Sequence, residues 1–255
     1  MSKPYFQNDL VTLYNGDCLE VMPRLEEKFD ACITDPPYGT TACKWDAVIP
    51  FDRMWSALLP VVKEDGAIVF TASQPFTSTL VCSNLADFKY SYVWVKTKAT
   101  GFQNAKIQPM RRHEDVLVFY RSQPTFNQLN LVELDVPVQS GRKRERNEEQ
   151  HRLGVAGKEH FTTFTGWQDS VLSFSNPSGA GHLHPTQKPV DLMKWLVKTY
   201  TNEGDIVLDF TAGSGSTGVA CMETNRRCVL IENDAHYCDV IADRLSSHHS
   251  QLELF

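Results

Sequence analysis

The chain of 255 residues carries 25 Lys and Arg against 31 Asp and Glu, a formal net charge of −6, and 42% of its residues are hydrophobic. This composition excludes a disordered or fibrous chain, and no apolar run reaches the 18 or more residues that a membrane-spanning helix needs. The first nine residues lack the apolar segment and cleavage site of a secretory signal, so we expect a soluble protein of the cytosol.

The first half of the chain alternates short apolar segments with amphipathic ones, which is the pattern of parallel strands joined by crossover helices. Asp65 and Gly66 predict a turn before the third of these strands. Two later segments rich in aromatic and β-branched residues predict the far edge of the same sheet. The fold class is therefore α/β. The predicted strands are 11–14, 31–34, 67–70, 90–95 and 116–120, and the predicted helices are 18–26, 51–62 and 75–85.

The tetrapeptide Asp35-Pro36-Pro37-Tyr38 directly follows the predicted strand 31–34, at the end of a strand where open α/β sheets bind ligands. The two prolines fix φ and lack N–H groups, so the carbonyl oxygens of Asp35 and Pro36 are held in rigid directions beside a carboxylate. Such a pair of acceptors matches the two N–H donors of an exocyclic amine. The ring of Tyr38 offers a flat face on which a base can stack.

The middle of the chain differs in composition from both ends. Segment 121–183 is polar, contains Gly and Pro throughout and shows little periodicity, so we expect an insertion and not a second core. Between residues 89 and 152 the chain has 12 Lys and Arg against 7 Asp and Glu, a net charge of +5, whereas the remainder carries −11. The densest basic run, 142–146, is expected on an exposed loop, where it fits either contact with phosphate or an ordinary solvated surface.

The last third returns to alternating helices and strands, predicted as helix 190–200, strand 205–209, helix 217–224, strand 228–231 and helix 236–245. Between the first of these strands and the next helix, Gly213, Gly215 and Gly218 follow the pattern G-x-G-x-x-G, which lets the backbone turn sharply and a ligand approach closely. Glu232 ends the following strand, where a carboxylate can accept hydrogen bonds from both hydroxyls of a ribose. This arrangement predicts a cofactor that contains a nucleoside, and it leaves a nicotinamide dinucleotide and S-adenosylmethionine both open.

The proline-rich tetrapeptide favours S-adenosylmethionine. The nitrogen lone pair of an aromatic amine is delocalised into its ring, which makes the nitrogen a poor nucleophile. When the Asp35 carboxylate and the Pro36 carbonyl each accept one N–H, the lone pair becomes localised and can be aimed at the methyl group of a sulfonium. This direct transfer needs no covalent enzyme intermediate, and the chain contains no Pro-Cys dipeptide of the kind used by enzymes that methylate ring carbon.

Together, Asp35-Pro36-Pro37-Tyr38 and segment 209–218 resemble the amino-methyltransferases of DNA, and the order of the two motifs resembles the β class of that family. The resemblance covers most of the chain outside the insertion. It implies a Rossmann-like, S-adenosylmethionine-dependent methyltransferase fold with a circularly permuted motif order. Because Asp and not Ser heads the tetrapeptide, it favours transfer to N6 of adenine over N4 of cytosine. Family members usually have Pro-Phe after the aspartate of the cofactor loop, whereas this chain has Phe210-Thr211, so it departs from the family pattern where an aromatic contact to the cofactor is expected.

The resemblance also implies which residues bind and react. Segment 184–189 resembles the cofactor-binding segment of the family and places Thr186 and Lys188 near the methionine carboxylate. Asp17 would contact the adenine amine of the cofactor, although an Asp at this position is also a favoured helix cap. The implied catalytic residues are Asp35, Pro36, Pro37 and Tyr38, and the implied cofactor-binding residues are Asp17, Thr186, Lys188, Asp209, Phe210, Ala212, Gly213, Ser214, Gly215 and Glu232.

Segments 94–96 and 112–114 resemble family segments near the target base and the sheet edge, although His113 and Glu114 fit a structural hydrogen-bonded pair equally well. A base in a duplex must be flipped out before its amine can react, so something must hold the distorted double-stranded DNA. The basic middle of the chain has the composition for this. We therefore predict a catalytic half in residues 1–120, an inserted target-recognition region in 121–183 and a cofactor-binding half in 184–255. The expected DNA-binding residues are Arg111, Arg112, Arg142, Lys143, Arg144 and Arg146.

Other interpretations remain open from the sequence. A nicotinamide-dependent oxidoreductase would explain the glycines and Glu232 but would leave the proline-rich tetrapeptide without a role. A non-catalytic DNA-binding module, an N4-cytosine methyltransferase and an enzyme that methylates RNA or a protein amide are further alternatives. Enzymes of this family often dimerise, so a homodimer is compatible with the resemblance. No metal and no membrane contact are expected, since the seven Cys and eight His lack the spacing of metal ligands.

Overall fold

The computed structural model describes residues 3–41, 43, 46–140, 160–176, 183 and 186–252. The chain divides into two compact units, a larger one made of Met1–Asn127 with Ser170–Phe255 and a smaller one made of Gln128–Asp169. Among the described residues, no helix combines the length and the apolar character needed to cross a membrane.

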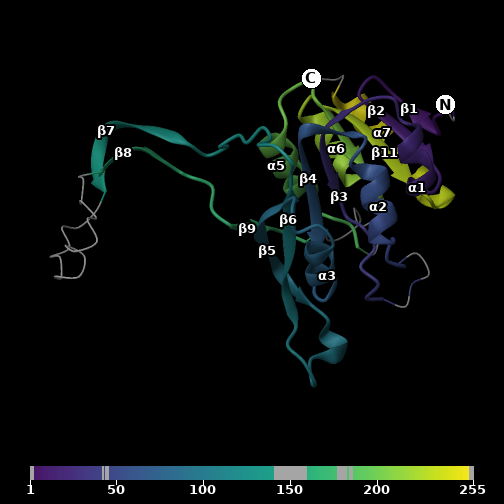
Figure 1. Ribbon diagram of the computed structural model, residues 1–255, viewed down its shortest axis with the longest axis horizontal. Helices are drawn as coiled ribbons and strands as arrows, with labels where there is room; N and C mark the ends of the chain where they lie inside the picture. Colours follow the sequence, from purple (N-terminus) through teal and green to yellow (C-terminus); the bar gives the residue numbers. More distant parts are fainter. Residues whose placement is uncertain are drawn as a thin grey trace. The chain divides into compact units, whose positions relative to one another are not determined.

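The larger unit is built on one mixed sheet, which can be followed in Figure 1. In spatial order the strands among the described residues are β1 (Phe6–Gln7), β2 (Val11–Asn15), β11 (Arg227–Glu232), β10 (Ile206–Asp209), β3 (Phe29–Thr34), β4 (Val62–Ala72), β6 (Arg111–Phe119), β5 (Phe88–Thr100) and β9 (Val171–Phe174). The central strands β2, β11, β10, β3 and β4 are parallel, β6 runs antiparallel to β4, and β5 runs antiparallel to β6.

Helices cover both faces of this sheet, and each face has its own hydrophobic core. One face carries a first set of helices, α1 (Cys18–Val21), a 3₁₀ helix (Met22–Arg24), α2 (Phe51–Leu58) and α3 (Phe76–Ser83), and the other a second set, α5 (Val190–Tyr200), α6 (Ser216–Glu223) and α7 (Ala235–Leu252). Successive residues of a strand point to opposite faces, so Cys32 packs with the first set while Ala31 and Ile33 pack with the second. The larger unit therefore has three layers, and the predicted α/β fold class is confirmed.

Two helices in the first half end four or five residues earlier than predicted. The helix predicted over 18–26 ends at Val21 and continues only as a 3₁₀ turn, because Pro23 has no N–H for an α-helical hydrogen bond. The helix predicted over 51–62 ends at Leu58, shortly before Pro60. The turn predicted at Asp65 and Gly66 lies inside β4, at a shift in its pairing with β3, since Phe29 pairs with Val62 but Ala31 pairs with Ala67.

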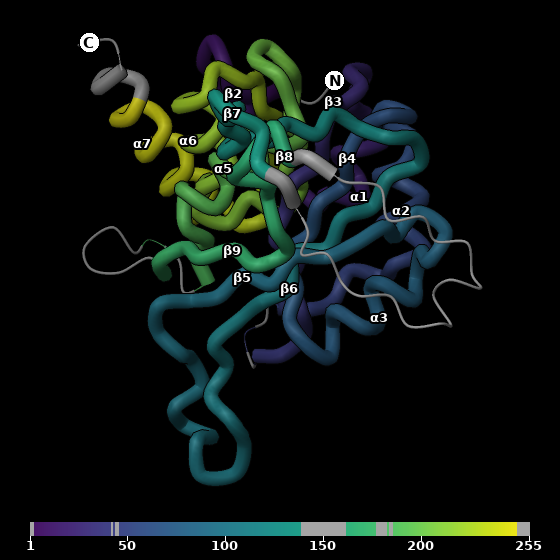
Figure 2. The backbone as a smooth tube through the Cα atoms, turned by 90° about the vertical axis from the view of Figure 1, so that its left-hand side faces the viewer, coloured from purple at the N-terminus to yellow at the C-terminus, as the bar shows by residue number. Residues whose placement is uncertain are grey.

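The far edge of the sheet contains the two strands predicted from aromatic and β-branched residues, β5 and β6. The segment that joins them, residues 101–110, projects away from the sheet as a long loop (Figure 2). The loop exposes apolar side chains, since Phe102 is 79% and Ile107 is 83% exposed. Strand β9, which lies within the segment expected to be an insertion, pairs with β5 and completes this edge.

The smaller unit contains an antiparallel pair, β7 (Val132–Ser140) and β8 (His160–Thr165). Trp167 of this unit is 59% exposed and makes an edge contact with the ring of Phe164 at 6.4 Å. The compact unit is shorter than the region predicted to be inserted, because β9 belongs to the main sheet. Four residues expected to bind DNA, Arg142, Lys143, Arg144 and Arg146, lie outside the described residues.

Candidate active site

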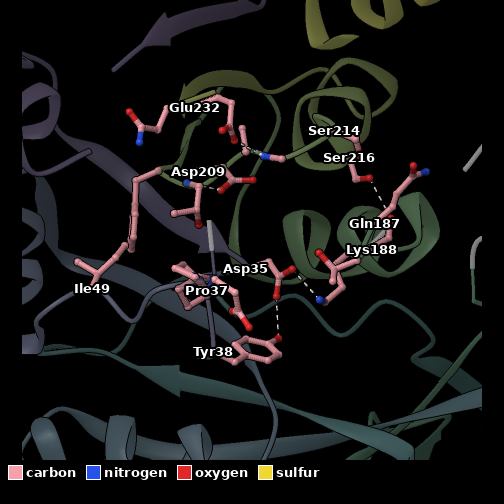
Figure 3. Close-up of a pocket in the computed structure, with 18 of the residues that line it drawn as sticks. Asp35, Pro37, Tyr38, Ile49, Gln187, Lys188, Asp209, Ser214, Ser216 and Glu232 are labelled. Carbon is pink, nitrogen blue, oxygen red and sulfur yellow. Dashed lines mark hydrogen bonds and ion pairs between the residues drawn. The ribbon is translucent and has the colours of Figure 1, made fainter. Parts of the chain in front are cut away.

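A cavity of about 1250 Å³ opens at the carboxyl ends of the parallel strands (Figure 3). Its walls include residues that directly follow four strands: Gly16 after β2, Asp35 after β3, Phe210 after β10 and Asn233 after β11. The strands β3 and β10 are neighbours in the sheet although they are far apart in the chain, so the cavity lies at the point where the strand order reverses. Ligands of open α/β sheets bind at such a point.

Asp209 anchors the glycine-containing loop that follows β10. Its carboxylate accepts hydrogen bonds from the hydroxyl groups of Thr34, at 2.7 Å, and Thr217, at 2.6 Å, and from the backbone N–H of Thr211 at 3.2 Å. Burial raises the pKa of Asp209 to about 6, although these donors oppose the shift. The carboxylate thus ties the end of β3, the loop and the start of α6 together.

Two glycines of the predicted G-x-G-x-x-G pattern have the geometry that the pattern requires. Gly215 has a φ of +76° at the start of α6, where other residues are strained. A Cβ on Gly218 would stand 2.8 Å from a methyl group of Leu230, so only glycine lets α6 pack this closely on β11. Gly213 lines the cavity with a φ of +55°, and a Cβ there would have no atom of the protein within 4 Å. The backbone at Gly213 is therefore open to the cavity.

Glu232 and Asp17 line the same part of the cavity. Glu232 accepts the backbone N–H of Gly213 at 2.8 Å and that of Asp234 at 2.9 Å, and burial raises its pKa. Asp17 caps α1 by accepting the N–H of Leu19 at 2.8 Å. Each oxygen of a carboxylate has two lone pairs, so both groups retain acceptor sites for a ligand.

The carboxylate of Asp35 is held by three side chains. Its Oδ1 accepts the hydroxyl groups of Tyr38 at 2.7 Å and Thr71 at 2.5 Å, and its Oδ2 accepts Lys188 Nζ at 2.6 Å. Figure 3 shows Asp35 between Tyr38 and Lys188. These contacts fix the rotation of the carboxylate at the end of β3. Among the described residues they leave one of its roughly four lone-pair positions for a further donor.

The ring of Tyr38 lies between an aromatic ring and a cation. It stacks on Phe76 with a centroid distance of 5.2 Å and an interplanar angle of 25°, and Lys188 Nζ lies 5.4 Å from its centroid. Burial, reinforced by the charge of Asp35, raises the pKa of Tyr38 well above its usual value. Tyr38 therefore remains a neutral phenol that donates to Asp35.

Lys188 is buried between two carboxylates, those of Asp35 and Glu114. Burial alone would lower its pKa, but the two negative charges raise the pKa above its ordinary value. Burial likewise opposes ionisation of Glu114, yet Lys188 and Lys96 bring the pKa of Glu114 below its ordinary value. Both residues therefore carry charge at neutral pH, and Lys188, expected near a methionine carboxylate, contacts the carboxylate of Asp35.

The loop after the tetrapeptide is organised by Asp46. Its carboxylate accepts the backbone N–H groups of Gly39 and Thr40 at 2.9 Å and of Thr41 at 2.6 Å. These hydrogen bonds lower the pKa of Asp46 against the opposing effect of burial. Asp46 thereby shapes the wall of the cavity that continues from Tyr38.

Most residues predicted for the site line this one cavity. Two predicted residues in the described part of the chain do not line it: Gly215, and Arg112, whose side chain is exposed outside the cavity. Thr34 and Thr71, which donate hydrogen bonds to Asp209 and Asp35, were not among the predicted site residues. Lys96 and Glu114, which line the cavity, were predicted only as parts of the segments near the target base and the sheet edge. The predicted residues that line the cavity are Asp17, Asp35, Pro36, Pro37, Tyr38, Arg111, Thr186, Lys188, Asp209, Phe210, Ala212, Gly213, Ser214 and Glu232.

Comparison with known proteins identifies the same family as the sequence motifs. The N6/N4 methyltransferase family model, described as DNA methylase, matches residues 29–243. The DNA adenine methyltransferase YhdJ of Escherichia coli (strain K12) is 28% identical over 271 residues, which cover 98% of this chain and 88% of the relative. The predicted family is therefore confirmed.

Solved structures show the same fold. The M1.HpyAVI–SAM complex aligns with a TM-score of 0.62 at 24% identity, over 92% of this chain and 100% of that chain. The PvuII DNA methyltransferase, described as cytosine-N4-specific, aligns with a TM-score of 0.66 at 15% identity, over 98% of this chain and 94% of that chain. The predicted Rossmann-like methyltransferase fold is confirmed. Since the family model spans most of the chain, the protein belongs to the N6/N4 family of DNA methylases, enzymes that use S-adenosylmethionine.

Proposed function

We propose that this protein transfers a methyl group from S-adenosylmethionine to N6 of adenine in double-stranded DNA, after the target base has been flipped into the cavity. The observation that carries the proposal is the position of the Asp35 carboxylate. Three donors orient it, and it shares one cavity with the glycine loop and Glu232. A hydrogen-bond acceptor for an amine and a candidate nucleoside site thus lie together.

The residues of the cavity fit S-adenosylmethionine. Glu232 has acceptor positions for ribose hydroxyls, and Asp17 has one for the amine of an adenine. The open backbone at Gly213 leaves room that a side chain would fill. When bound, S-adenosylmethionine supplies an electrophilic methyl group on a sulfonium. Thr186 and Lys188 also line the cavity, and Lys188 serves the site through its contact with Asp35.

On the substrate side, Asp35 and Pro36 act as a pair of acceptors. The free lone-pair position of the Asp35 carboxylate takes one N–H of the target amine, and the rigid Pro36 carbonyl takes the other. These two hydrogen bonds localise the nitrogen lone pair. As positive charge grows on the nitrogen, the negative charge of Asp35 stabilises it, and the surplus proton leaves through Asp35 or water.

The identity of the methylated base is the test of this proposal. Duplex DNA is incubated with the protein and S-adenosylmethionine, digested to nucleosides, and the modified nucleoside is identified by mass. We expect N6-methyl-2′-deoxyadenosine, because Asp heads the tetrapeptide. N4-methyl-2′-deoxycytidine would keep the family chemistry but contradict the choice of base, and unmodified DNA would contradict the proposed function as a whole.

The loop between β5 and β6 is a candidate for holding the duplex. Thr100 and Arg111, at the two ends of this loop, line the cavity, and Phe102 and Ile107 are the most exposed of the large apolar side chains between them. We expect the double variant Phe102→Ala with Ile107→Ala to raise the KM for DNA by about tenfold, because apolar side chains that enter the base stack offset the cost of opening it. Steady-state methylation kinetics on a duplex with adenine at the target position measures the KM. A second duplex with 2-aminopurine at that position, which has no N6 amine to methylate, reports base flipping through its fluorescence.

The matched control for the loop variant is Leu85→Ala, which removes another exposed apolar side chain, 64% exposed, that does not line the cavity. The control should leave both the KM and the 2-aminopurine fluorescence unchanged. If the loop variant flips and methylates the base as well as the parent, the loop has no part in opening the duplex.

The basic run outside the described residues is a second candidate for DNA contact. We expect replacement of Arg142, Lys143, Arg144 and Arg146 by Ala to weaken DNA binding and to reduce the slope of log Kd against log salt by about 0.9 for each phosphate that the variant no longer neutralises. Fluorescence anisotropy with labelled duplex across a salt series measures both effects. Lys198→Ala, at an exposed position of α5, is the control. Equal binding by the quadruple variant and the parent at about 200 mM salt would exclude the run from DNA binding.

A further inference from the structure

Four side chains of alternating charge, of which Lys96 and Lys188 are buried and Glu114 and Asp35 partly buried, form a continuous row that ends at Asp35. Lys96 Nζ pairs with Glu114 Oε1, Glu114 Oε2 lies 3.5 Å from Lys188 Nζ, and Lys188 Nζ lies 2.6 Å from Asp35 Oδ2. The side chains are 9%, 13%, 7% and 21% exposed in that order. They come from β5, β6, the segment before α5 and the end of β3. We call Lys96, Glu114, Lys188 and Asp35 the charge row.

The two oxygens of Glu114 have different roles in the charge row. Oε1 accepts a hydrogen bond from Lys96, whereas Oε2 is buried and accepts no hydrogen bond from the described residues. Its nearest ionic partner there is Lys188, at 3.5 Å. If Glu114 only stabilised the fold through an ion pair, Lys96 alone would neutralise its charge. The second oxygen instead faces the ammonium group that holds the catalytic carboxylate.

The charges of the row sum to zero, and this balance matters because the row is largely buried. Removing one member of a buried ion pair leaves an uncompensated charge, which is far costlier than replacing both members together. Without Glu114, Lys188 would have Asp35 as its single anionic partner among the described residues, and the site would gain one positive charge. That charge would stand beside the amine on which positive charge grows during transfer.

We propose that Glu114 is a positioning residue, which acts through Lys188 to orient the Asp35 carboxylate and to keep the site neutral during methyl transfer. The proposal rests on the proposed function of the same cavity. Glu114 draws Lys188 toward itself, so Asp35 Oδ2 shares the ammonium with a second carboxylate and keeps acceptor strength for the target amine. Lys96, in contact with the ring of Trp94 at 5.2 Å, balances Glu114 on its far side.

The test uses the full chain with Glu114→Gln, which keeps the size of the side chain and removes its charge. We expect kcat on duplex DNA to fall about 10- to 100-fold, because an unbalanced charge acts directly on the transition state. The KM for DNA and the Kd for S-adenosylmethionine should stay within about twofold of the parent values, because the groups that bind the two ligands remain. Glu64→Gln, at a carboxylate 68% exposed on β4, is the matched control and should change nothing.

The double variant Glu114→Gln with Lys96→Met separates the proposed charge balance from a purely structural role. It removes one charge of each sign, so the row is neutral again, and we expect it to recover at least about tenfold of the lost kcat. If the double variant loses the sum of the two single losses, or if the Kd for S-adenosylmethionine rises in parallel with the loss of kcat, Glu114 is structural and the proposal is wrong. An unchanged kcat in Glu114→Gln overturns it as well.

Two further comparisons keep the outcome interpretable. Should Glu114→Gln fail to fold by circular dichroism, Glu114→Asp replaces it, since the shorter side chain withdraws the carboxylate from Lys188 but keeps its charge; a kcat equal to that of the parent would then refute positioning. Parent protein that binds DNA but methylates nothing would refute the proposed function itself. An active parent with an equally active Glu114→Gln would refute only the role of Glu114.

Discussion

Asp35→Asn protein is expected to methylate DNA about 10³-fold more slowly than the parent, while it still binds S-adenosylmethionine. The substitution preserves the shape of the side chain but replaces a carboxylate by an amide. The amide cannot stabilise positive charge on the target nitrogen, and its NH₂ group cannot accept the hydrogen bonds that Tyr38, Thr71 and Lys188 now donate. Single-turnover transfer of a labelled methyl group, with enzyme in excess of DNA, measures the loss directly.

Asp65→Asn is the matched control for this variant, because Asp65 is exposed and lies outside the cavity. Donor binding by calorimetry and thermal unfolding show whether the Asp35→Asn cavity is intact, which matters because Lys188 loses one of its two carboxylate partners. A folded, donor-loaded Asp35→Asn protein that reacts as fast as the parent would refute the amine-acceptor mechanism. A non-catalytic DNA-binding module would show no activity in either protein.

Glu232→Ala is expected to weaken the binding of S-adenosylmethionine by about 100-fold, with smaller effects on the transfer step once the donor is bound. The carboxylate has two functions that are lost together. It holds the N–H groups of Gly213 and Asp234, and it offers acceptor positions to the ribose. Isothermal titration of S-adenosylmethionine measures the change in Kd.

The control for Glu232 is Glu203→Ala, an exposed carboxylate two residues before Asp205. It should bind the donor as the parent does.

Titration of the parent with NADH also separates the two cofactors that the glycine pattern leaves open. Tight binding of NADH together with no binding of S-adenosylmethionine would contradict the proposed donor site, and a Glu232→Ala protein with unchanged Kd would show that the ribose is held elsewhere.

The sequence was sufficient to predict the parts of the site that follow directly from strands. Asp35 immediately follows the buried strand β3, and Asp209 is the last residue of the buried strand β10. The carboxyl ends of parallel strands lie at one edge of a sheet, so the two carboxylates were expected close together. The glycine spacing and Glu232 add a local pattern with a known geometric purpose. These features depend on short segments, so sequence order was enough to bring them to one edge.

The charge row depends on pairing between distant strands, which a local pattern does not specify. Lys96 continues the buried face of β5 after Tyr92 and Trp94, with the alternation of a half-buried strand. A lysine on a buried face needs an anionic partner, so the sequence indicated that Lys96 has one. The sequence did not indicate which residue this partner is, because Glu114 lies on the neighbouring antiparallel strand. The contact of Lys188 with Asp35 was equally hidden, because 153 residues separate the two in the chain.

Strand β9 was missed for a different reason. It has four residues at the edge of the sheet, and Leu172 is its one buried side chain, so its hydrophobic alternation is too short to stand out from the polar segment around it. Its place is set by pairing with β5. The position of the boundaries of the inserted region therefore stays a prediction, whereas the compact unit Gln128–Asp169 is a property of the structure.

The pairing of β3 with β10 determines when the site can form during synthesis. Thr34 and Asp209, which share a hydrogen bond, are separated by 175 residues, so the tetrapeptide leaves the ribosome long before its partner strand exists. Closure of so long a loop carries a large entropic cost that only the complete sheet repays. A nascent chain that ends before β10 thus lacks the wall of the cavity that Asp209 and the glycine loop form, and the cavity can form only after β10 has been made.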